Sequence, residues 1–257
     1  MGMKRYWIYI MMSLGLAACG GDEAVESPYE KGMGGLSMEA AVDYTTKIPV
    51  ITKSADFSAL DVEKFYIEIQ PEAGGEKVFN KTYTEFKNEG RPFLMNQGRY
   101  RIVVGSRREA EMTASSTPYF AYEGSFLIQE KTTTNLSVTC TYESLGVELV
   151  LSEQLQAKIA ERPNYYKYTV TVSNGAGEWS FDKENMEPGY FRQDCEELVV
   201  TVTGSFDGRE YPTRTYRIKN NGQAPQLGEY YIITLDAGEE PEANEASLRA
   251  VQINHER

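Results

Sequence analysis

Histidine is nearly absent from this chain of 257 residues, which contains His255 and no other. The nucleophilic triads of serine and cysteine hydrolases need an imidazole that the fold holds beside the nucleophile. Histidine-based zinc sites need two or more such rings. A single histidine in a polar stretch meets neither condition. We therefore expect no catalytic residue, no metal site and no bound cofactor, and a protein that is not an enzyme.

Cysteine is also scarce, with Cys19, Cys140 and Cys195 as the three present. Cys140 lies on the apolar side of a predicted strand, where a buried thiol behaves as a small hydrophobic group. Cys195 is flanked by the acidic residues Asp194 and Glu196. The two could pair in an oxidising compartment, but sequence does not fix the distance between their Cα atoms. Two unpaired thiols are the favoured interpretation, and a disulfide stays open as the alternative.

Basic residues are outnumbered, with 26 Lys and Arg against 38 Asp and Glu, for a formal net charge of −12. A nucleic acid or an anionic membrane surface binds to clustered positive charge, and no basic patch offsets the acidic balance here. The composition therefore argues against a nucleic-acid partner.

The apolar run from Tyr6 to Leu16 follows the basic pair Lys4 and Arg5. It is too short to cross a hydrocarbon core of about 30 Å. A short basic region followed by a short apolar region is typical of a secretory signal peptide, which is removed from the mature protein. We expect such a peptide over residues 1–18.

The leader ends in Leu16-Ala17-Ala18-Cys19, the pattern of a bacterial lipobox. In that interpretation the Cys19 thiol receives a lipid and palmitate-like acyl chains anchor the protein in the outer membrane, with about 0.8 kcal/mol gained per buried methylene. The alternative is a plain signal peptide with an incidental cysteine. Residues 19–33 are acidic and contain Gly, Ser and Pro, which predicts a solvated tether.

Apolar and polar residues alternate along most of the remaining chain, with turn residues at short intervals, as in all-β sandwiches. Gly35 to Val42 is an example, and Val78 to Phe86 is also expected to be a strand. Ser152 is the expected N-cap of one short helix. The two halves are weakly similar, which predicts sandwiches over 34–143 and 144–237; a single larger sandwich is the alternative. Residues 238–257 are acidic and are expected to be a disordered tail.

Aromatic residues are plentiful, with 18 Tyr, 10 Phe and 2 Trp. Exposed aromatic rings contact sugars and protein partners. If Tyr119, Tyr122 and Tyr165 are exposed together, they are candidate ligand contacts. Aromatic residues at alternate positions are more often part of a core, and that interpretation is favoured.

Several segments together resemble a Bacteroidetes-type lipoprotein family of unknown function over roughly Gly34 to Asp236. The resembling segments are the lipobox, the first strand from Gly34 to Ser37, Thr52-Lys53 before Asp61 to Ile69, Gly98 to Tyr100, Pro118 to Gly124, Leu136 to Cys140, Gly146-Val147, Tyr168 to Ser173 and Pro188 to Phe191. The resemblance implies two tandem Greek-key sandwiches, Ig-like or transthyretin-like, related to fimbrillin-like cell-surface adhesins.

Fimbrillins mature by cleavage after a basic residue near the first strand, so the resemblance makes Lys47 and Lys53 candidate cleavage sites. Two ordinary lysines in a surface loop are the favoured interpretation. The function implied is a lipid-anchored, non-catalytic protein exposed on the cell surface, an adhesin or a pilus-accessory subunit, with a protein or glycan ligand. The alternative is a carbohydrate-binding accessory lipoprotein of an outer-membrane glycan-uptake system.

Overall fold

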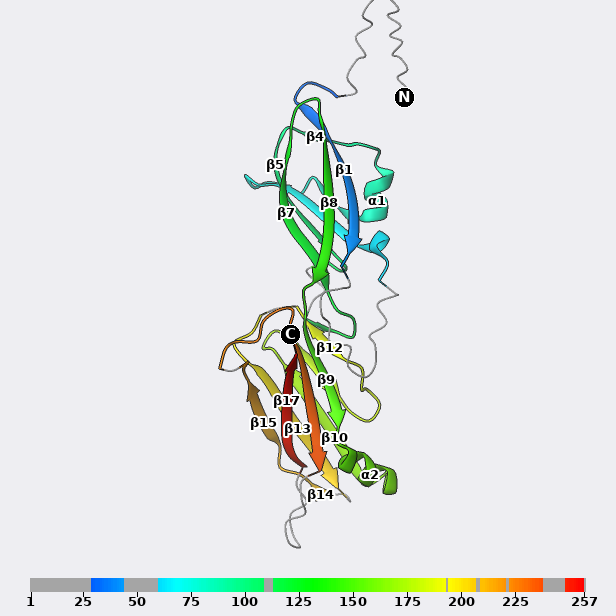
Figure 1. Cartoon of the computed structure of the whole chain (residues 1–257), viewed down its shortest axis with the longest axis vertical. Helices are drawn as coiled ribbons and strands as arrows, with labels where there is room; N and C mark the ends of the chain where they lie inside the picture. The colour runs from blue at the N-terminus through cyan, green and yellow to red at the C-terminus, as the bar shows by residue number, and fades with distance from the viewer. Residues whose placement is uncertain are drawn as a thin grey trace, which may run out of the picture.

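The chain folds into two β-rich halves that are stacked end to end in a computed structural model (Figure 1). The structure describes residues 29–43, 60–108, 113–192, 194–206, 209–220, 222–237 and, for the backbone, 248–256. Strands dominate these segments, which confirms the predicted all-β class. The exact boundaries of the two predicted domains stay a prediction.

The first half is built from seven strands in the order β3-β2-β5-β7-β8-β1-β4. Two residue pairs, Phe120↔Tyr142 and Ala121↔Thr141, join β7 to β8, so the sheet folds over on itself around one core. The strands are β1 (Met33–Val42), β2 (Tyr66–Pro71), β3 (Phe79–Thr82), β4 (Phe93–Asn96), β5 (Gly98–Gly105), β7 (Phe120–Ile128) and β8 (Thr133–Tyr142).

The second half has two five-stranded sheets with a shared apolar core. One sheet has the order β17-β16-β9-β12-β6, and in the other β11, β10, β13 and β14 follow one another while β15 also pairs with β13. The strands are β6 (Ala114–Ser115), β9 (Leu145–Leu151), β10 (Tyr166–Ser173), β11 (Glu178–Phe181), β12 (Gly189–Phe191), β13 (Leu198–Phe206), β14 (Arg209–Glu210), β15 (Arg214–Ile218), β16 (Tyr230–Ala237) and β17 (Leu248–Glu256).

Alternation in the sequence matches burial in these strands. In β10, Tyr168, Val170 and Val172 are buried while their neighbours are at least partly exposed. Successive side chains of a strand point to opposite faces, so every second residue enters the core between the two sheets. The predicted first strand is likewise present as β1.

The helices agree in part with prediction. Ser152 caps α2 (Glu153–Glu161) by accepting a hydrogen bond from the Leu155 N–H, as expected. The prediction of one strand from Val78 to Phe86 is wrong, because β3 ends at Thr82 and α1 (Tyr83–Asn88) follows it directly. Thr82 and Glu85 form a capping box, in which each side chain bonds the backbone N–H of the other residue. A short 3₁₀ turn, η2 (Val62–Lys64), precedes β2.

The C-terminal tail was predicted to be disordered from 238 to 257, and for residues 248–256 this is wrong. They form β17, which pairs antiparallel with β16 at the edge of its sheet. Most of the acidic residues of the tail precede this segment, in which Arg249 and Glu256 are the charged side chains. Charge therefore does not oppose the hydrogen bonds that backbone pairing with an existing strand supplies. The earlier part of the tail lies outside the described residues.

The two halves share residues at their junction. Strand β6, which belongs to the first half in sequence, pairs with β12 in the second half. Conversely, Tyr190 and Tyr230 of the second half pack into the core of the first. The link from β8 to β9 is short, consisting of residues 143 and 144. The junction is therefore a packed interface rather than a linker.

Strand β1 pairs in parallel with β8 over eight residue pairs, from Gly35↔Thr133 to Val42↔Cys140. Since β8 runs directly into the second half, the start of β1 lies at the opposite end of the first half, about 30 Å away at roughly 3.3 Å per residue. Figure 1 shows this arrangement, with β1 and β8 side by side above the second half.

The edge of β1 that faces away from β8 is covered partly by the strand β4 and partly by a side chain. Pairing with β4 ends at Leu36↔Phe93. Beyond that point the Tyr83 hydroxyl donates to the Met38 carbonyl at 3.2 Å and accepts from the Ala40 N–H at 3.2 Å. Tyr83 itself is buried. One phenol thus satisfies two backbone groups that a neighbouring strand would otherwise bond.

Replacement of Tyr83 by Phe removes both of these hydrogen bonds and leaves the two backbone groups without this partner. We expect the free energy of unfolding to fall by about 1–3 kcal/mol. Urea denaturation measures the change. Tyr66→Phe is the control, because Tyr66 is a half-buried tyrosine of the same half, on strand β2. Equal losses in the two variants would contradict this role for Tyr83.

Candidate functional site

The three tyrosines that would be candidate ligand contacts if exposed together do not form one exposed surface. Tyr119 is 2% exposed and packs at the junction between the halves, which agrees with the favoured interpretation of a core residue. Tyr122 is half-buried against the core of the first half. Tyr165 is 42% exposed and follows α2, at the end of the second half remote from the junction. Of the three, Tyr165 alone retains a substantially exposed ring.

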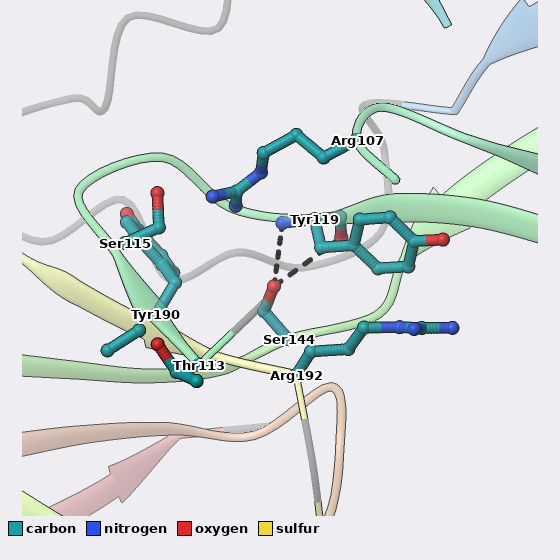
Figure 2. Close-up of a pocket in the computed structure, with 8 residues that line it drawn as sticks. Arg107, Thr113, Ser115, Tyr119, Ser144, Tyr190 and Arg192 are labelled. Atoms are coloured by element: carbon teal, nitrogen blue, oxygen red, sulfur yellow. Dashed lines mark hydrogen bonds between the residues drawn. The ribbon is translucent and has the colours of Figure 1, made fainter. Parts of the chain in front are cut away.

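Tyr119 is held from three sides (Figure 2). The buried Ser144 hydroxyl accepts from its backbone N–H at 2.7 Å. The Arg192 guanidinium lies 4.5 Å from the centre of its ring, a cation–π distance. Its hydroxyl lies so close to Gly105 that a Cβ there would be 2.3 Å away, so any side chain at position 105 would clash. Tyr119 is thus part of the packing that joins the halves.

A small cavity of about 10 Å³ lies beside Ser144. Its lining includes Arg107, Ser115, Tyr190 and Arg192, and Figure 2 shows the two guanidinium groups pointing in opposite directions. Arg107 donates to the Thr117 carbonyl. A cavity of this size holds about one water molecule. The site is therefore suited to fixing the junction and is too small for a substrate.

Next to this cavity, buried aromatic rings connect the two halves. Tyr142 of β8 lies edge-on to Tyr190 of β12 at 6.5 Å between ring centres, and Tyr190 lies 6.4 Å from Tyr230 of β16. The Tyr230 hydroxyl donates to the buried Glu148 carboxylate at 3.1 Å. Gly146 leaves room for this group, because a Cβ there would be 2.3 Å from the Tyr230 ring. We refer to Tyr142, Tyr190, Tyr230 and Glu148 as the tyrosine cluster.

Burial sets the protonation of the cluster. It raises the pKa of Tyr190 to about 12, with the nearby Glu148 charge adding to the shift. It also raises the pKa values of Tyr142 and Tyr230 above the ordinary range. All three phenols are therefore neutral near pH 7. The Tyr142 hydroxyl has no hydrogen-bond partner in the described structure, an uncommon state for a buried polar group.

A second buried carboxylate, Glu229, is also structural. It accepts from the Asn220 side-chain amide at 2.8 Å, the Tyr231 hydroxyl at 2.8 Å and the Gln226 N–H at 3.1 Å. These bonds hold the turn that leads into β16. Sequence reasoning missed both Glu148 and Glu229, because an isolated acid in a strand or turn is usually solvated.

The two thiols in the described segments are not poised for chemistry. Cys140 and Cys195 are both unpaired, which agrees with the favoured interpretation. Burial raises the pKa of Cys140 to about 12, and burial followed by the Asp194 charge raises that of Cys195 to about 11. A nucleophilic cysteine needs a lowered pKa. Both thiols therefore behave as packing groups.

Other sequence candidates give no further site. Within the described segments, no three His, Cys, Asp or Glu side chains gather as metal ligands, and no helix there is long and apolar enough to span a membrane. The Asp182 carboxylate accepts from the N–H groups of Glu184 and Asn185, as in an ordinary turn. Cys19, Lys47 and Lys53 lie outside the described residues.

Comparison with known proteins finds one matching family and several solved structures of low sequence identity. A family model described as a domain of unknown function (DUF4493) matches residues 32–256. No curated protein matches the chain.

Three of these solved structures are from Bacteroides species. A "putative cell adhesion protein" from Bacteroides ovatus has 10% identity and a TM-score of 0.40, covering 89% of this chain and 96% of its own. One from Bacteroides uniformis has 10% identity and a TM-score of 0.41, with 76% and 91% covered. A structure from Bacteroides thetaiotaomicron, named among "putative polysaccharide binding proteins", has 11% identity and a TM-score of 0.45, with 80% and 92% covered.

The tyrosine cluster generates a paired prediction on stability. Tyr142→Phe removes a buried hydroxyl that has no partner, so we expect the free energy of unfolding to stay equal or to rise, by up to about 1–3 kcal/mol. Tyr230→Phe removes a donor from a buried carboxylate and should lower it by about 1.5–3 kcal/mol. Urea denaturation of both variants checks this. A loss in Tyr142→Phe as large as in Tyr230→Phe would show that the Tyr142 hydroxyl has a partner.

Stability should also fall in alkaline solution. An unfolded tyrosine loses its proton near its ordinary pKa of about 10, whereas Tyr190 in the folded protein keeps it to about pH 12. The contribution of Tyr190 to the free energy of unfolding is complete below pH 10. It is lost as the pH rises through the pKa of Tyr190 in the folded protein, because in this range the unfolded chain binds fewer protons than the folded protein. Urea midpoints measured across this window test it. The urea midpoint should fall less in Tyr190→Phe than in the wild type between pH 10 and 12. A wild-type midpoint that does not change with pH would contradict the role given to Tyr190.

Proposed function

The chain belongs to the DUF4493 family, a domain of unknown function, and we propose that it is a lipid-anchored, non-catalytic, adhesin-like protein displayed on the outer surface of the cell. Cys19 carries the lipid in this proposal, and the ligand is a protein or a glycan. The single observation that supports it most strongly is the position of the first strand relative to the second half of the chain.

The described chain enters the first half at the end farthest from the junction. Met33 begins β1 there, and the parallel partner strand β8 leads away from that end into the second half. The chain from Cys19 to Met33 spans at most about 50 Å when fully extended. An anchor on Cys19 would therefore attach to the first half at its outer end, so that the second half is the part farther from the membrane attachment (Figure 1).

The outward end of the second half carries the exposed ring predicted as a contact. Tyr165 follows α2 at that end, and the Arg162 guanidinium lies 5.7 Å from its ring centre. An exposed tyrosine beside an arginine is typical of residues that contribute strongly to binding. We propose Tyr165 as a ligand contact, the one of the three candidate tyrosines with a substantially exposed ring.

The carbohydrate-binding accessory lipoprotein remains the alternative. It requires the same anchor and the same orientation, and differs in the ligand and in the partner proteins. The location on the cell is therefore common to both functions and is the first property to establish.

Protease applied to intact cells tests this location. We expect wild-type protein to be degraded from outside, because the second half faces the medium. The Cys19→Ala variant, which lacks the lipid-bearing thiol, should instead be released as soluble protein. Detection of the second half by antibody after treatment provides the measurement.

A periplasmic protein followed in the same cells is the control for an intact outer membrane. If the wild-type chain is protected until the outer membrane is broken, the adhesin proposal fails. A periplasmic scaffold would then be the better account of the fold.

A further inference from the structure

A groove of about 250 Å³ lies on the first half beside β1. It opens where β4 stops pairing with β1, since the chain before Phe93 turns away toward α1. Figure 1 shows α1 alongside β1 at this place. The groove is lined by Leu36, Ser37, Met38, Glu39, Tyr83, Phe86, Lys87, Gly90 and Arg91.

The floor of the groove offers little bare apolar surface. Leu36, Met38, Tyr83 and Phe86 are between 1% and 7% exposed. The Tyr83 hydroxyl is already bonded to the β1 backbone. Hydrophobic binding is proportional to the apolar area removed from water. A purely apolar ligand, including an apolar amino-acid side chain, would therefore gain little here.

The rim of the groove is polar and carries charge of both signs. Lys87 is engaged, since its ammonium pairs with Glu63 and lies 5.0 Å from the Tyr83 ring centre. Arg91 and Glu39 are exposed, and neither makes an ion pair within the described segments. One guanidinium and one carboxylate thus remain available to a ligand on the same small rim.

These groups complement a particular ligand chemistry. A guanidinium binds a carboxylate with two parallel hydrogen bonds. A carboxylate such as Glu39 is an acceptor for hydroxyl groups, and the Ser37 hydroxyl both donates and accepts. Pockets for drug-sized ligands occupy about 300–1,000 Å³, so a groove just below that range suits a single ring.

We propose that this groove binds an acidic monosaccharide unit of the uronic-acid type. The sugar carboxylate lies at Arg91, its hydroxyls bond Glu39 and Ser37, and its ring rests over the closed floor. The proposal goes beyond the proposed function, because it does not depend on the cell-surface location. It gives the carbohydrate-binding alternative a specific site and ligand class.

Titration of the purified, isotope-labelled full chain with glucuronate tests the proposal by NMR. We expect saturable shifts at the backbone amides of Ser37, Glu39 and Gly90. Glucose, which lacks the carboxylate, should bind at least tenfold more weakly. Arg91→Gln should weaken glucuronate binding by about tenfold or more, as for a charge-assisted hydrogen bond. Arg99→Gln is the matched control, an exposed arginine of the same half that does not line the groove, and should leave binding unchanged.

Absence of saturable shifts at tens of millimolar glucuronate would overturn the site. So would equal binding by wild type and Arg91→Gln, or shifts located elsewhere. Tighter binding of glutamate than of glucuronate would overturn the ligand class. If Arg91→Gln does not fold, the wild-type shift map and Glu39→Gln decide the question. Because the purified chain is used, failure here is distinct from failure of the surface location.

Discussion

The packing of buried tyrosines across the junction is the interaction on which the shape of the molecule depends. A link of two residues alone would not fix one orientation between the halves. Here Tyr142 contributes from the first half and Tyr190 and Tyr230 from the second, and all three belong to one core. The second half thus completes the core of the first. The relative position of the two ends of the molecule follows from this shared core, as does the direction in which an anchored chain would point.

The sequence predicted most strands because their period-2 pattern has one physical cause, burial of one face. It failed where local hydrogen bonding overrides that pattern. In Val78 to Phe86, alternation continues into residues that a capping box turns into α1. In the tail, high charge suggested disorder, whereas edge pairing with β16 forms a strand. Neither outcome depends on apolar periodicity, which is why periodicity did not reveal it.

The candidate sites were harder to predict than the fold. Tyr119 and Tyr165 each stand beside a second aromatic residue in the sequence, Phe120 and Tyr166, yet one is enclosed at the junction and the other is exposed beyond α2. Their difference arises from long-range contacts, such as that between Tyr119 and Gly105, that no local pattern encodes. The groove beside β1 likewise combines residues from two segments, Leu36 to Glu39 and Tyr83 to Arg91. Chemistry that is assembled in this way becomes visible only once the topology is known.

The parallel pairing of β1 and β8 also has a mechanical consequence. A pull between the start of β1 and the second half draws these two strands in opposite directions along their length. The load is then carried in shear by the hydrogen bonds of all eight residue pairs together, rather than by one bond at a time as when strands are peeled apart. Forced unfolding is governed by the rate of that first rupture. The connection between the two ends of the molecule is therefore built to resist tension along its long axis.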